Sequence, residues 1–310
     1  MNIFTLTLNP AFDIHAEAKS FALHKESVAS VTSRDVGGKG INISRALSAF
    51  GAENEAFVVL GSENGREFSA MLDADGVKHT AIVTEGRIRE NITVHVQGER
   101  ETRLSFRGFT AGDELLDRLE EQLLPRLSPD DVLTFTGSVP RGISRERITT
   151  FLMRVRARGA QLVLDSKDLT REDILSLRPA LIKPNEEEVS AYVGKEALTL
   201  SDCVSGAREL SLSGVFCAMV SFGGEGAILA ASGHVYLARP PKIEPISTVG
   251  AGDSSIAGFL CASLQDASAE ECLKMAVAFG TAACLTEGTN PPRKEDVEAL
   301  LPLVTVESIL

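Results

Sequence analysis

The chain has 310 residues, 43 acidic and 31 basic side chains, a formal net charge of −12 and 44% hydrophobic residues. A chain of this length can bury a full core, and its ordinary share of charged residues, 24%, excludes a disordered protein. The acidic balance argues against nucleic acid as the main partner, because no basic surplus is available to neutralise a phosphate backbone. Any anionic ligand must therefore be held by local groups.

Cysteine and histidine usage gives no sign of a disulfide framework or a metal site. The five cysteines form no CxxC pair and lie in apolar stretches, which is typical of reduced, buried thiols. The five histidines show no HxxxH or HExxH spacing, and we therefore predict no structural metal. Residues 1–8 lack the basic and long apolar regions of a signal peptide, and no apolar stretch is long enough to span a bilayer. We expect a cytoplasmic protein with no membrane partner.

Short apolar runs alternate with longer amphipathic segments along most of the chain. This alternation predicts a parallel sheet with helices on both faces, and the near-continuous apolar runs fit strands that are buried on both sides. In chain order we expect a strand at Ile3–Leu8, a helix at Ile41–Phe50, a strand at Ala56–Leu60, helices at Glu67–Asp73 and Asp113–Leu124, a strand at Val132–Thr136, a helix at Arg145–Arg158, strands at Gln161–Asp165 and Ala180–Lys183, helices at Glu186–Val193 and Asp202–Leu212, a strand at Val215–Ser221, a hairpin at Ala227–Ala231 and His234–Ala238, and helices at Ser254–Ser263 and Ala269–Leu285.

Two segments, residues 10–35 and 87–110, do not follow the alternation. They carry strand signals, such as Ile92 and Val94, but no helix pattern. We interpret them as a small inserted β lid, an accessory sheet over one edge of the main one. Because no linker rich in Pro, Gly or Ser separates the lid, we expect a single domain over residues 1–310.

A glycine-containing segment, residues 248–255, opens an apolar helical run. Gly250 and Gly252 let main-chain N–H groups converge, and the following helix adds its positive N-terminal end, which suits a phosphate. Asp253 at this point can accept a proton from a hydroxyl while an anion forms beside it. An ordinary helix N-terminus with a favourable acidic residue explains the same pattern equally well.

A second glycine cluster, residues 37–42, also precedes an expected helix. Its small residues allow close backbone approach, while Lys39 and Asn42 offer a charge and an amide to a polyol or a phosphate. The segment is not a Walker A loop, because Gly40 follows the lysine and no Ser or Thr adjoins it. A simple strand-to-helix turn is the alternative interpretation.

Two further segments follow expected strands. Asn185 and Glu188 have the spacing of a capping box, which is a purely structural explanation. The same amide and carboxylate, at the carboxyl end of a parallel strand, can order the water shell of Mg²⁺ while Lys183 reaches a phosphate. Residues 221–226 are glycine-rich, and they either wrap a nucleotide or simply connect to the hairpin.

Taken together with the N-terminal segment, these clusters show a specific pattern: the chain resembles the ribokinase-like (PfkB) carbohydrate kinase family over essentially its whole length. The matching segments are Thr5–Asp13, Gly37–Asn42, Lys183–Asn185 and Gly250–Asp253. The first two are similar to the branch that phosphorylates hexose monophosphates, which contains 1-phosphofructokinases and tagatose-6-phosphate kinases. The resemblance implies an α/β fold with a doubly wound, mostly parallel sheet sandwiched by helices.

The resemblance also implies roles for individual residues. Asp253 corresponds to the catalytic base, and the anion hole to the amides of Gly250, Ala251 and Gly252. The contacts to the sugar phosphate correspond to Asp13, Gly38, Lys39, Asn42, Arg89, Asn91 and Ser138, with Arg103 and Arg107 as further candidates. The ATP-binding residues correspond to Lys183, Asn185, Ser221, Gly223, Gly224 and Gly226, with Mg²⁺ held near Glu188 through water. A monovalent cation would lie at Ser247, Val249 and Ala283.

The activity implied by the resemblance is transfer of the γ-phosphoryl group of ATP to fructose 1-phosphate, giving fructose 1,6-bisphosphate. Ile88 replaces the threonine that is usual before Arg89 in this branch, so tagatose-6-phosphate kinase remains an alternative. A non-catalytic sugar-phosphate sensor on the same fold is an alternative of a different class. Exposed edge strands on the lid favour a homodimer.

Overall fold

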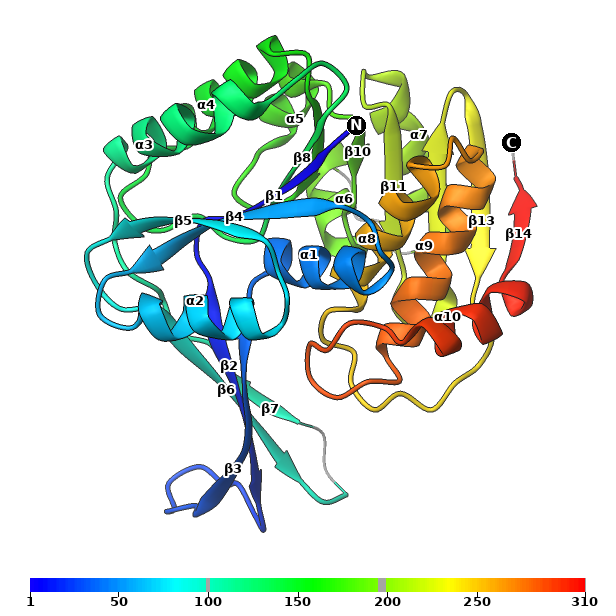
Figure 1. Ribbon diagram of the computed structural model, residues 1–310. Coiled ribbons are helices and arrows are strands. Elements are labelled where there is room, and N and C mark those ends of the chain that lie inside the picture. Colours follow the sequence, from blue (N-terminus) through cyan, green and yellow to red (C-terminus); the bar gives the residue numbers. More distant parts are fainter. Residues whose placement is uncertain (99–100, 195–198, 310) are drawn as a thin grey trace.

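Within residues 1–98, 101–194 and 199–309, which the computed structural model describes, a ten-stranded sheet forms the centre (Figure 1). Neighbouring strands from β5 to β11 pair in parallel, whereas β12, β13 and β14 continue the sheet in antiparallel fashion. The sequence prediction of a mostly parallel α/β fold is thus confirmed. From one edge to the other the strands are β14 (Thr305–Ser308), β13 (His234–Arg239), β12 (Ala227–Ala231), β11 (Cys217–Ser221), β10 (Leu181–Ile182), β9 (Gln161–Asp165), β8 (Val132–Thr136), β1 (Ile3–Thr7), β4 (Asn54–Gly61) and β5 (His79–Thr84).

Helices cover both faces of this sheet. The apolar side chains of the helices on one face join a single core cluster, and these helices are α3 (Glu114–Leu123), α4 (Arg145–Ala157), α5 (Arg171–Leu177), α6 (Glu186–Val193) and α7 (Leu200–Leu212). A second cluster, on the other face, includes apolar residues of α1 (Lys39–Ala49), α8 (Ala251–Ser263), α9 (Ala269–Ala283) and α10 (Lys294–Leu300). Helix α2 (Gly65–Ala74) packs against β4 and β5.

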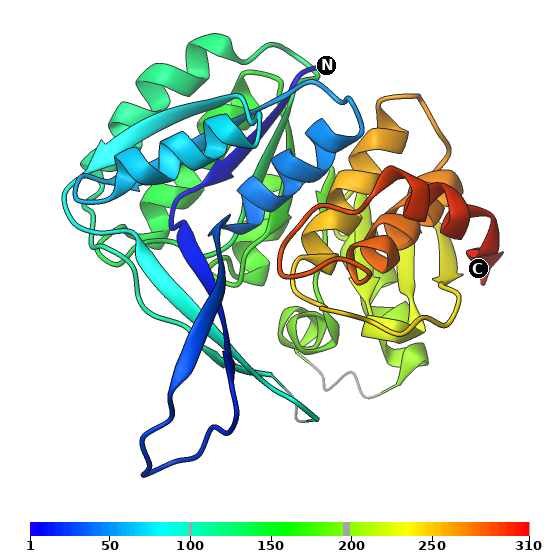
Figure 2. The same ribbon diagram turned by 60° about the horizontal axis from the view of Figure 1, so that its bottom comes forward.

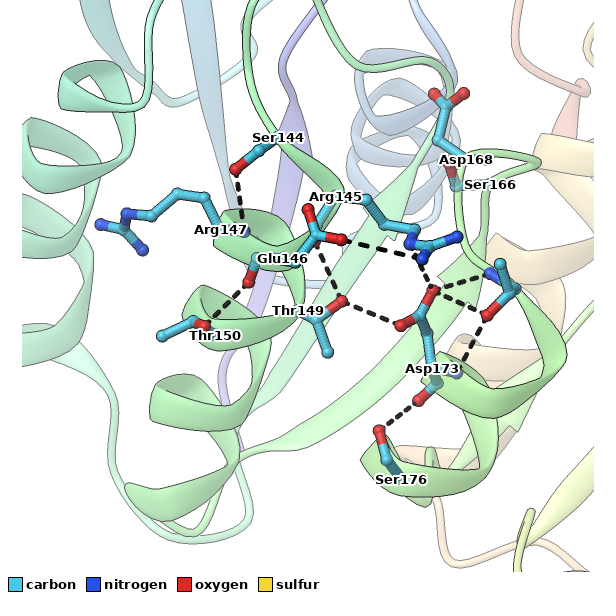
Figure 3. Close-up of polar contacts among 11 residues, drawn as sticks. Ser144, Arg145, Glu146, Arg147, Thr149, Thr150, Ser166, Asp168, Asp173 and Ser176 are labelled. Carbon is cyan, nitrogen blue, oxygen red and sulfur yellow. Dashed lines mark hydrogen bonds and ion pairs between the residues drawn. The ribbon is translucent and has the colours of Figure 1, made fainter.

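The N-termini of α4 and α5 show how local sequence starts these helices (Figure 3). The Ser144 hydroxyl accepts a hydrogen bond from the Arg147 amide at 3.3 Å. Thr170 and Asp173 cap α5 reciprocally, and the Asp173 carboxylate accepts from the Thr170 amide at 2.9 Å. The hydroxyl of Thr149 in α4 donates to the same carboxylate at 3.2 Å. Because capping groups satisfy the free amides of a first helical turn, Asp173 both starts α5 and fixes it to α4.

A second, four-stranded sheet projects from the body of the molecule (Figure 2). Its strands, in spatial order, are β3 (Ala29–Gly37), β2 (Ala11–Ala18), β6 (Arg89–Val96) and β7 (Thr102–Leu104). The small sheet predicted from the two insertions is therefore present. Only residues 8–10 separate β1 from β2, so the edge over which the small sheet lies is the one formed by the carboxyl-terminal ends of the central strands.

The hairpin of β12 and β13 and the helices α8 and α9 lie where the sequence predicts them. Apart from three short 3-10 helices, the elements in the described residues without a predicted counterpart are β5, α5, α10 and β14. The expected strand at residues 180–183 shortens at both ends to the two residues of β10, and on its carboxyl side Pro184 has no amide hydrogen to extend the ladder. In the part of the chain that the structure describes, no helix is both long and apolar enough to cross a membrane.

Candidate active site

A cleft of about 630 Å³ opens at the carboxyl-terminal ends of the central strands. Its walls come from the ends of β1, β8 and β9, from the first turns of α1 and α8, and from the small sheet. Ligands of open α/β sheets bind at this edge. The cleft brings together the predicted residues Asp13, Gly38, Lys39, Asn42, Arg89, Asn91, Ser138, Lys183, Glu188, Gly250, Gly252 and Asp253. The residues of the predicted anion hole and nucleotide site that lie outside its lining are Ala251, Asn185, Ser221, Gly223, Gly224 and Gly226.

The cleft carries an excess of positive charge in a chain whose net charge is −12. Its anionic side chains are Asp13, Asp165, Glu188 and Asp253. Its cationic side chains are Lys39, Arg89, Arg103, Lys167 and Lys183. Because low-dielectric walls focus such a field, the cleft favours a ligand with several negative charges.

Asp253 lies in the first turn of α8. Gly250 precedes the helix with φ of +81°, a left-handed conformation that glycine adopts at no steric cost. Among the described residues, no acceptor contacts the amides of Gly250, Gly252 and Asp253, whereas the amide of Ala251 donates to the Thr248 carbonyl at 3.4 Å. Free amides and the positive end of the helix therefore form an anion-binding turn next to the Asp253 carboxylate.

The Asp253 carboxylate is buried, and the side-chain amide of Asn42 donates to its Oδ2 at 2.8 Å. Burial is the largest influence and raises the pKa of Asp253 to about 6, with Lys39 opposing the shift and Asp165 adding to it. A carboxylate whose pKa lies near the working pH is ionised and still basic enough to accept a proton. The geometry thus supports the role of base that the sequence predicts for Asp253.

Asp165 is a buried carboxylate that the sequence analysis missed. It ends β9, accepts a hydrogen bond from the Lys39 ammonium at 2.9 Å, and lies 3.6 Å from the Lys183 ammonium. Burial acts to raise the pKa of Asp165, but Lys183 and Lys39 more than offset it and hold this pKa below its ordinary value. Asp165 therefore fixes two cations at the cleft wall. The available signal was its place at the end of a predicted buried strand.

Asp13, Asn91 and Arg103 meet at the small-sheet wall of the cleft. The Asn91 amide and the Arg103 guanidinium donate to Asp13 Oδ1 at 2.9 Å and 3.0 Å. Gly37 lies against the other oxygen, Oδ2, where an added Cβ atom would come within 2.1 Å. The sequence analysis left Arg103 open, and the structure places it in the cleft, whereas Arg107 is exposed and outside the lining.

The Arg89 guanidinium contacts carbonyl groups instead of a carboxylate. It donates to the main-chain oxygens of Asn9 and Phe106 at 3.1 Å and 3.2 Å. Burial lowers the pKa of Arg89, Asp13 opposes this effect, and the positive charge of Arg103 adds to it. Since no partner carboxylate neutralises Arg89 through a hydrogen bond among the described residues, its charge is available to an anionic ligand.

The segment after β10 forms the opposite wall. Asn185 and Glu188 make the capping box that the spacing indicates, with hydrogen bonds of 3.0 Å and 2.8 Å. The Glu188 side chain still lines the cleft, as does Lys183, whose ammonium lies beside Gly252. The structural interpretation of this motif is thus confirmed, and it leaves the carboxylate of Glu188 at the cleft.

The loop after β11 lies next to this wall, because Ser221 pairs with Asn185 in a parallel bridge. Gly226 has φ of +112°, and an added Cβ atom would lie 2.0 Å from the Ala238 carbonyl, so packing alone requires this glycine. A Cβ atom at Gly223 or Gly224 would meet no atom within 4 Å. These two positions therefore face open space beside the cleft.

The residues predicted to hold a monovalent cation come from two neighbouring segments. The Ser247 hydroxyl accepts from the Val249 amide at 3.2 Å, and the Ser247 amide donates to the Cys284 carbonyl at 3.4 Å. The loop before α8 therefore lies beside the end of α9, where Ala283 precedes Cys284. Cation binding at this place stays a prediction.

A buried carboxylate beside a helix turn with free amides, in a cleft at the carboxyl ends of a mostly parallel α/β sheet, is an arrangement suited to phosphoryl transfer, and the relatives of the chain are phosphotransferases. The chain belongs to the pfkB family of carbohydrate kinases, whose family model matches residues 10–296.

The chain is 29% identical over 307 residues to a 1-phosphofructokinase from Vibrio cholerae, and the match covers 99% of this chain and 97% of that protein. A tagatose-6-phosphate kinase from Staphylococcus epidermidis is 29% identical over 291 residues, 93% of this chain and 94% of that protein. The crystal structure of phosphofructokinase-2 from Escherichia coli with substrates and products superposes with a TM-score of 0.92 at 28% identity, covering 98% of this chain and 99% of that one.

Proposed function

We propose that the chain transfers the γ-phosphoryl group of ATP to the C6 hydroxyl of fructose 1-phosphate, giving fructose 1,6-bisphosphate and ADP. The observation that carries the proposal is a single cleft that holds both groups the reaction needs: Asp253 beside a helix turn with free amides, and Arg89, which hydrogen-bonds to no carboxylate among the described residues. The similarity to the Vibrio cholerae 1-phosphofructokinase supports the choice of sugar. Because the donor is ATP and the five cysteines are free thiols, we place the reaction in the cytoplasm.

In this reaction Asp253 accepts the proton of the C6 hydroxyl while that oxygen bonds to the γ-phosphorus. The bond from the γ-phosphorus to the bridging oxygen breaks, and ADP leaves with the electron pair. The amides of Gly250 and Gly252 stabilise charge on the transferring group, Lys183 stabilises charge on the nucleotide phosphates, and Lys39, which Asp165 holds in place, contacts the sugar phosphate. Positioning and electrostatic stabilisation supply most of the catalysis of phosphoryl transfer. The small sheet then acts as a lid that excludes water.

The cleft fits a magnesium ion that enters with the nucleotide. Asp165 Oδ2 is buried without a hydrogen-bond partner among the described residues, although the Lys183 ammonium lies 3.6 Å from it, and Glu188 offers a second carboxylate to the cleft. Carboxylate and water oxygens are the ligands that Mg²⁺ prefers, so these two residues would hold the ion directly or through water. When bound, Mg²⁺ neutralises charge on the β- and γ-phosphates.

Tagatose-6-phosphate kinase is the second candidate, favoured by the similarity to the Staphylococcus epidermidis enzyme. Coupled ADP-release assays with fructose 1-phosphate, tagatose 6-phosphate and fructose 6-phosphate, side by side, decide between the sugars. We expect the highest kcat/KM with fructose 1-phosphate. A higher value with tagatose 6-phosphate would transfer the assignment to the second candidate.

A sensor without catalysis is the candidate of a different class. The buried, polarised Asp253 argues against it, because a sensor has no need of a base with a raised pKa. Binding of a ketohexose phosphate without ADP formation, at any magnesium concentration, would support the sensor and contradict the kinase.

The pKa of Asp253 predicts the pH dependence of the reaction. Its raised value of about 6 means that the carboxylate is protonated, and therefore inactive as a base, below this pH and ionised above it. We expect kcat/KM to rise with pH through a midpoint near 6. A pH profile of the wild type checks this, and a parallel profile of the residual activity of Asp253→Asn corrects for titration of the phosphorylated substrate. Identical profiles for the two proteins would exclude Asp253 as the titrating base.

We further propose that the chain forms a homodimer through the small sheet. The outer strands β3 and β7 leave main-chain groups unpaired, and large apolar side chains on and near this sheet are exposed: Leu23, Val28, Val31, Leu104 and Phe106. Light scattering after size exclusion should give twice the chain mass of 33.1 kDa. The double variant Val28→Glu, Val31→Glu should give the mass of one chain, and a monomeric wild type would contradict the proposal.

A further inference from the structure

We propose that Asn9 positions the side chains that bind the phosphate of the sugar substrate, an assignment that rests on the proposed kinase activity. Asn9 follows β1 in the segment Thr5–Asp13, and sequence reasoning gave it no role. The residue is 9% exposed and lines the cleft. Both its side chain and its main chain contact residues of the cleft, Ser138 and Arg89.

The side chain of Asn9 orients the hydroxyl of Ser138. Its Nδ2 donates to Ser138 Oγ at 3.1 Å. A hydroxyl has one proton and two lone pairs, so a serine that accepts from an amide keeps its own proton free to donate. Within the described part of the chain nothing accepts that proton, and Ser138 lines the cleft. The Ser138 hydroxyl is therefore set as a donor toward an anionic ligand.

The main chain of Asn9 holds Arg89. Its carbonyl oxygen accepts from Arg89 Nη2 at 3.1 Å, while Nη1 donates to Phe106 across the small sheet. Arg89 Nε is buried and has no acceptor among the described residues. One residue thus contacts both a hydroxyl donor and a guanidinium whose charge is not neutralised by a hydrogen-bonded carboxylate.

The position of the Asn9 side chain is itself fixed by its surroundings. An added Cβ atom at Gly108 would come within 2.1 Å of Asn9 Oδ1, so the segment that follows β7 packs directly on the carboxamide. Asn9 therefore connects the end of β1, the Ser138 loop and the small sheet. This arrangement orders the donors before the substrate arrives, which lowers the entropic cost of binding it.

The chemistry of these donors selects the substrate group. A charged guanidinium and a hydroxyl with a free proton suit the oxygens of a phosphate monoester, and charge-assisted bonds of this kind are stronger than those to a neutral sugar hydroxyl. Losing one such bond costs roughly 1.5–3 kcal/mol, so loss of the Asn9 amide should raise the KM for the sugar phosphate about tenfold or more. The KM for ATP and kcat should change little, because among the described residues neither Asn9 nor Ser138 hydrogen-bonds to Asp253, whose carboxylate accepts from Asn42.

The test is a double-mutant cycle in the full chain, with fructose 1-phosphate as the substrate. We compare Asn9→Ala, Ser138→Ala and the double variant, and we expect the double variant to show no larger KM than Ser138→Ala alone. Asn9→Asp keeps the size of the side chain but replaces the donor by an acceptor, so the Ser138 proton turns toward residue 9 and the KM should rise similarly. Asn54→Ala, which removes an amide at the start of β4 that donates to Ser48 at 3.0 Å, is the matched control with unchanged KM.

Two results would overturn the role of Asn9: an unchanged sugar-phosphate KM in Asn9→Ala and Asn9→Asp, or effects of Asn9→Ala and Ser138→Ala that simply multiply. Equal rises in the KM for ATP and for the sugar would also overturn it, because they indicate a general structural defect. Failure of the proposed function is a separate result, namely no turnover of any ketohexose phosphate by the wild type. In that case calorimetric titration of the same variants with fructose 1-phosphate still decides the role of Asn9.

Discussion

Asp253→Asn should lower kcat by roughly 10²–10⁴-fold while the KM for the sugar phosphate changes little. The substitution keeps the size of the side chain and its place in the first turn of α8. An amide cannot accept the proton of the C6 hydroxyl, so the loss falls on the transition state and not on substrate binding. Steady-state kinetics in the ADP-release assay measure both constants.

Asp117→Asn is the control for this variant, because Asp117 lies on α3 and its side chain is largely exposed in an ion pair with Arg147. It should keep wild-type kinetics. Both variants should unfold at temperatures close to that of the wild type. Near wild-type turnover of Asp253→Asn would remove Asp253 from the mechanism.

Asp165→Asn should destabilise the protein by about 3 kcal/mol or more. Asp165 is the carboxylate between the Lys39 and Lys183 ammonium groups, and Lys183 is buried. Neutralising Asp165 leaves two positive charges close together, one of them without water to screen it. Chemical denaturation, with the slope compared between variants, measures the change in the free energy of unfolding.

Lys183→Met provides the test of this explanation. The double variant Asp165→Asn, Lys183→Met should recover part of the lost stability, because it removes the uncompensated charge.

Asp165→Asn should also shift the acid limb of the kcat/KM profile to lower pH, since the charge of Asp165 contributes to raising the pKa of Asp253. A fully stable Asp165→Asn protein would contradict the described charge arrangement.

The elements that the sequence predicts correctly are those whose apolar residues are continuous or strongly periodic. All five residues of β1 and of β8 are buried, and such runs admit few other interpretations. The elements that the sequence analysis missed lack this signal. Strand β5 is only partly buried and contains His79 and two threonines, and β14 is a mostly exposed edge strand. Helices α5 and α10 have seven residues each, which is too short for a clear period.

The sequence predicts those residues of the cleft that lie in a glycine cluster or in a family signature. Asp253, Lys39 and Asn42 belong to such clusters, and the structure brings them into one cleft. Asp165 and Asn9 belong to the same cleft, but their partners are 126 and 129 residues away along the chain. A single sequence contains no sign of which distant side chains a strand end will meet. Only the order of strands in the sheet, with β9 and β1 on either side of β8, supplies that information.

Phosphorus NMR of a reaction containing the wild type, fructose 1-phosphate, ATP and Mg²⁺ tests the central claim most directly. We expect ADP and a ketohexose bisphosphate in equal amounts, with the second phosphate ester on C6 and no inorganic phosphate beyond the background. ATP consumption that yields inorganic phosphate without a bisphosphate, or no consumption with any ketohexose phosphate, would contradict it.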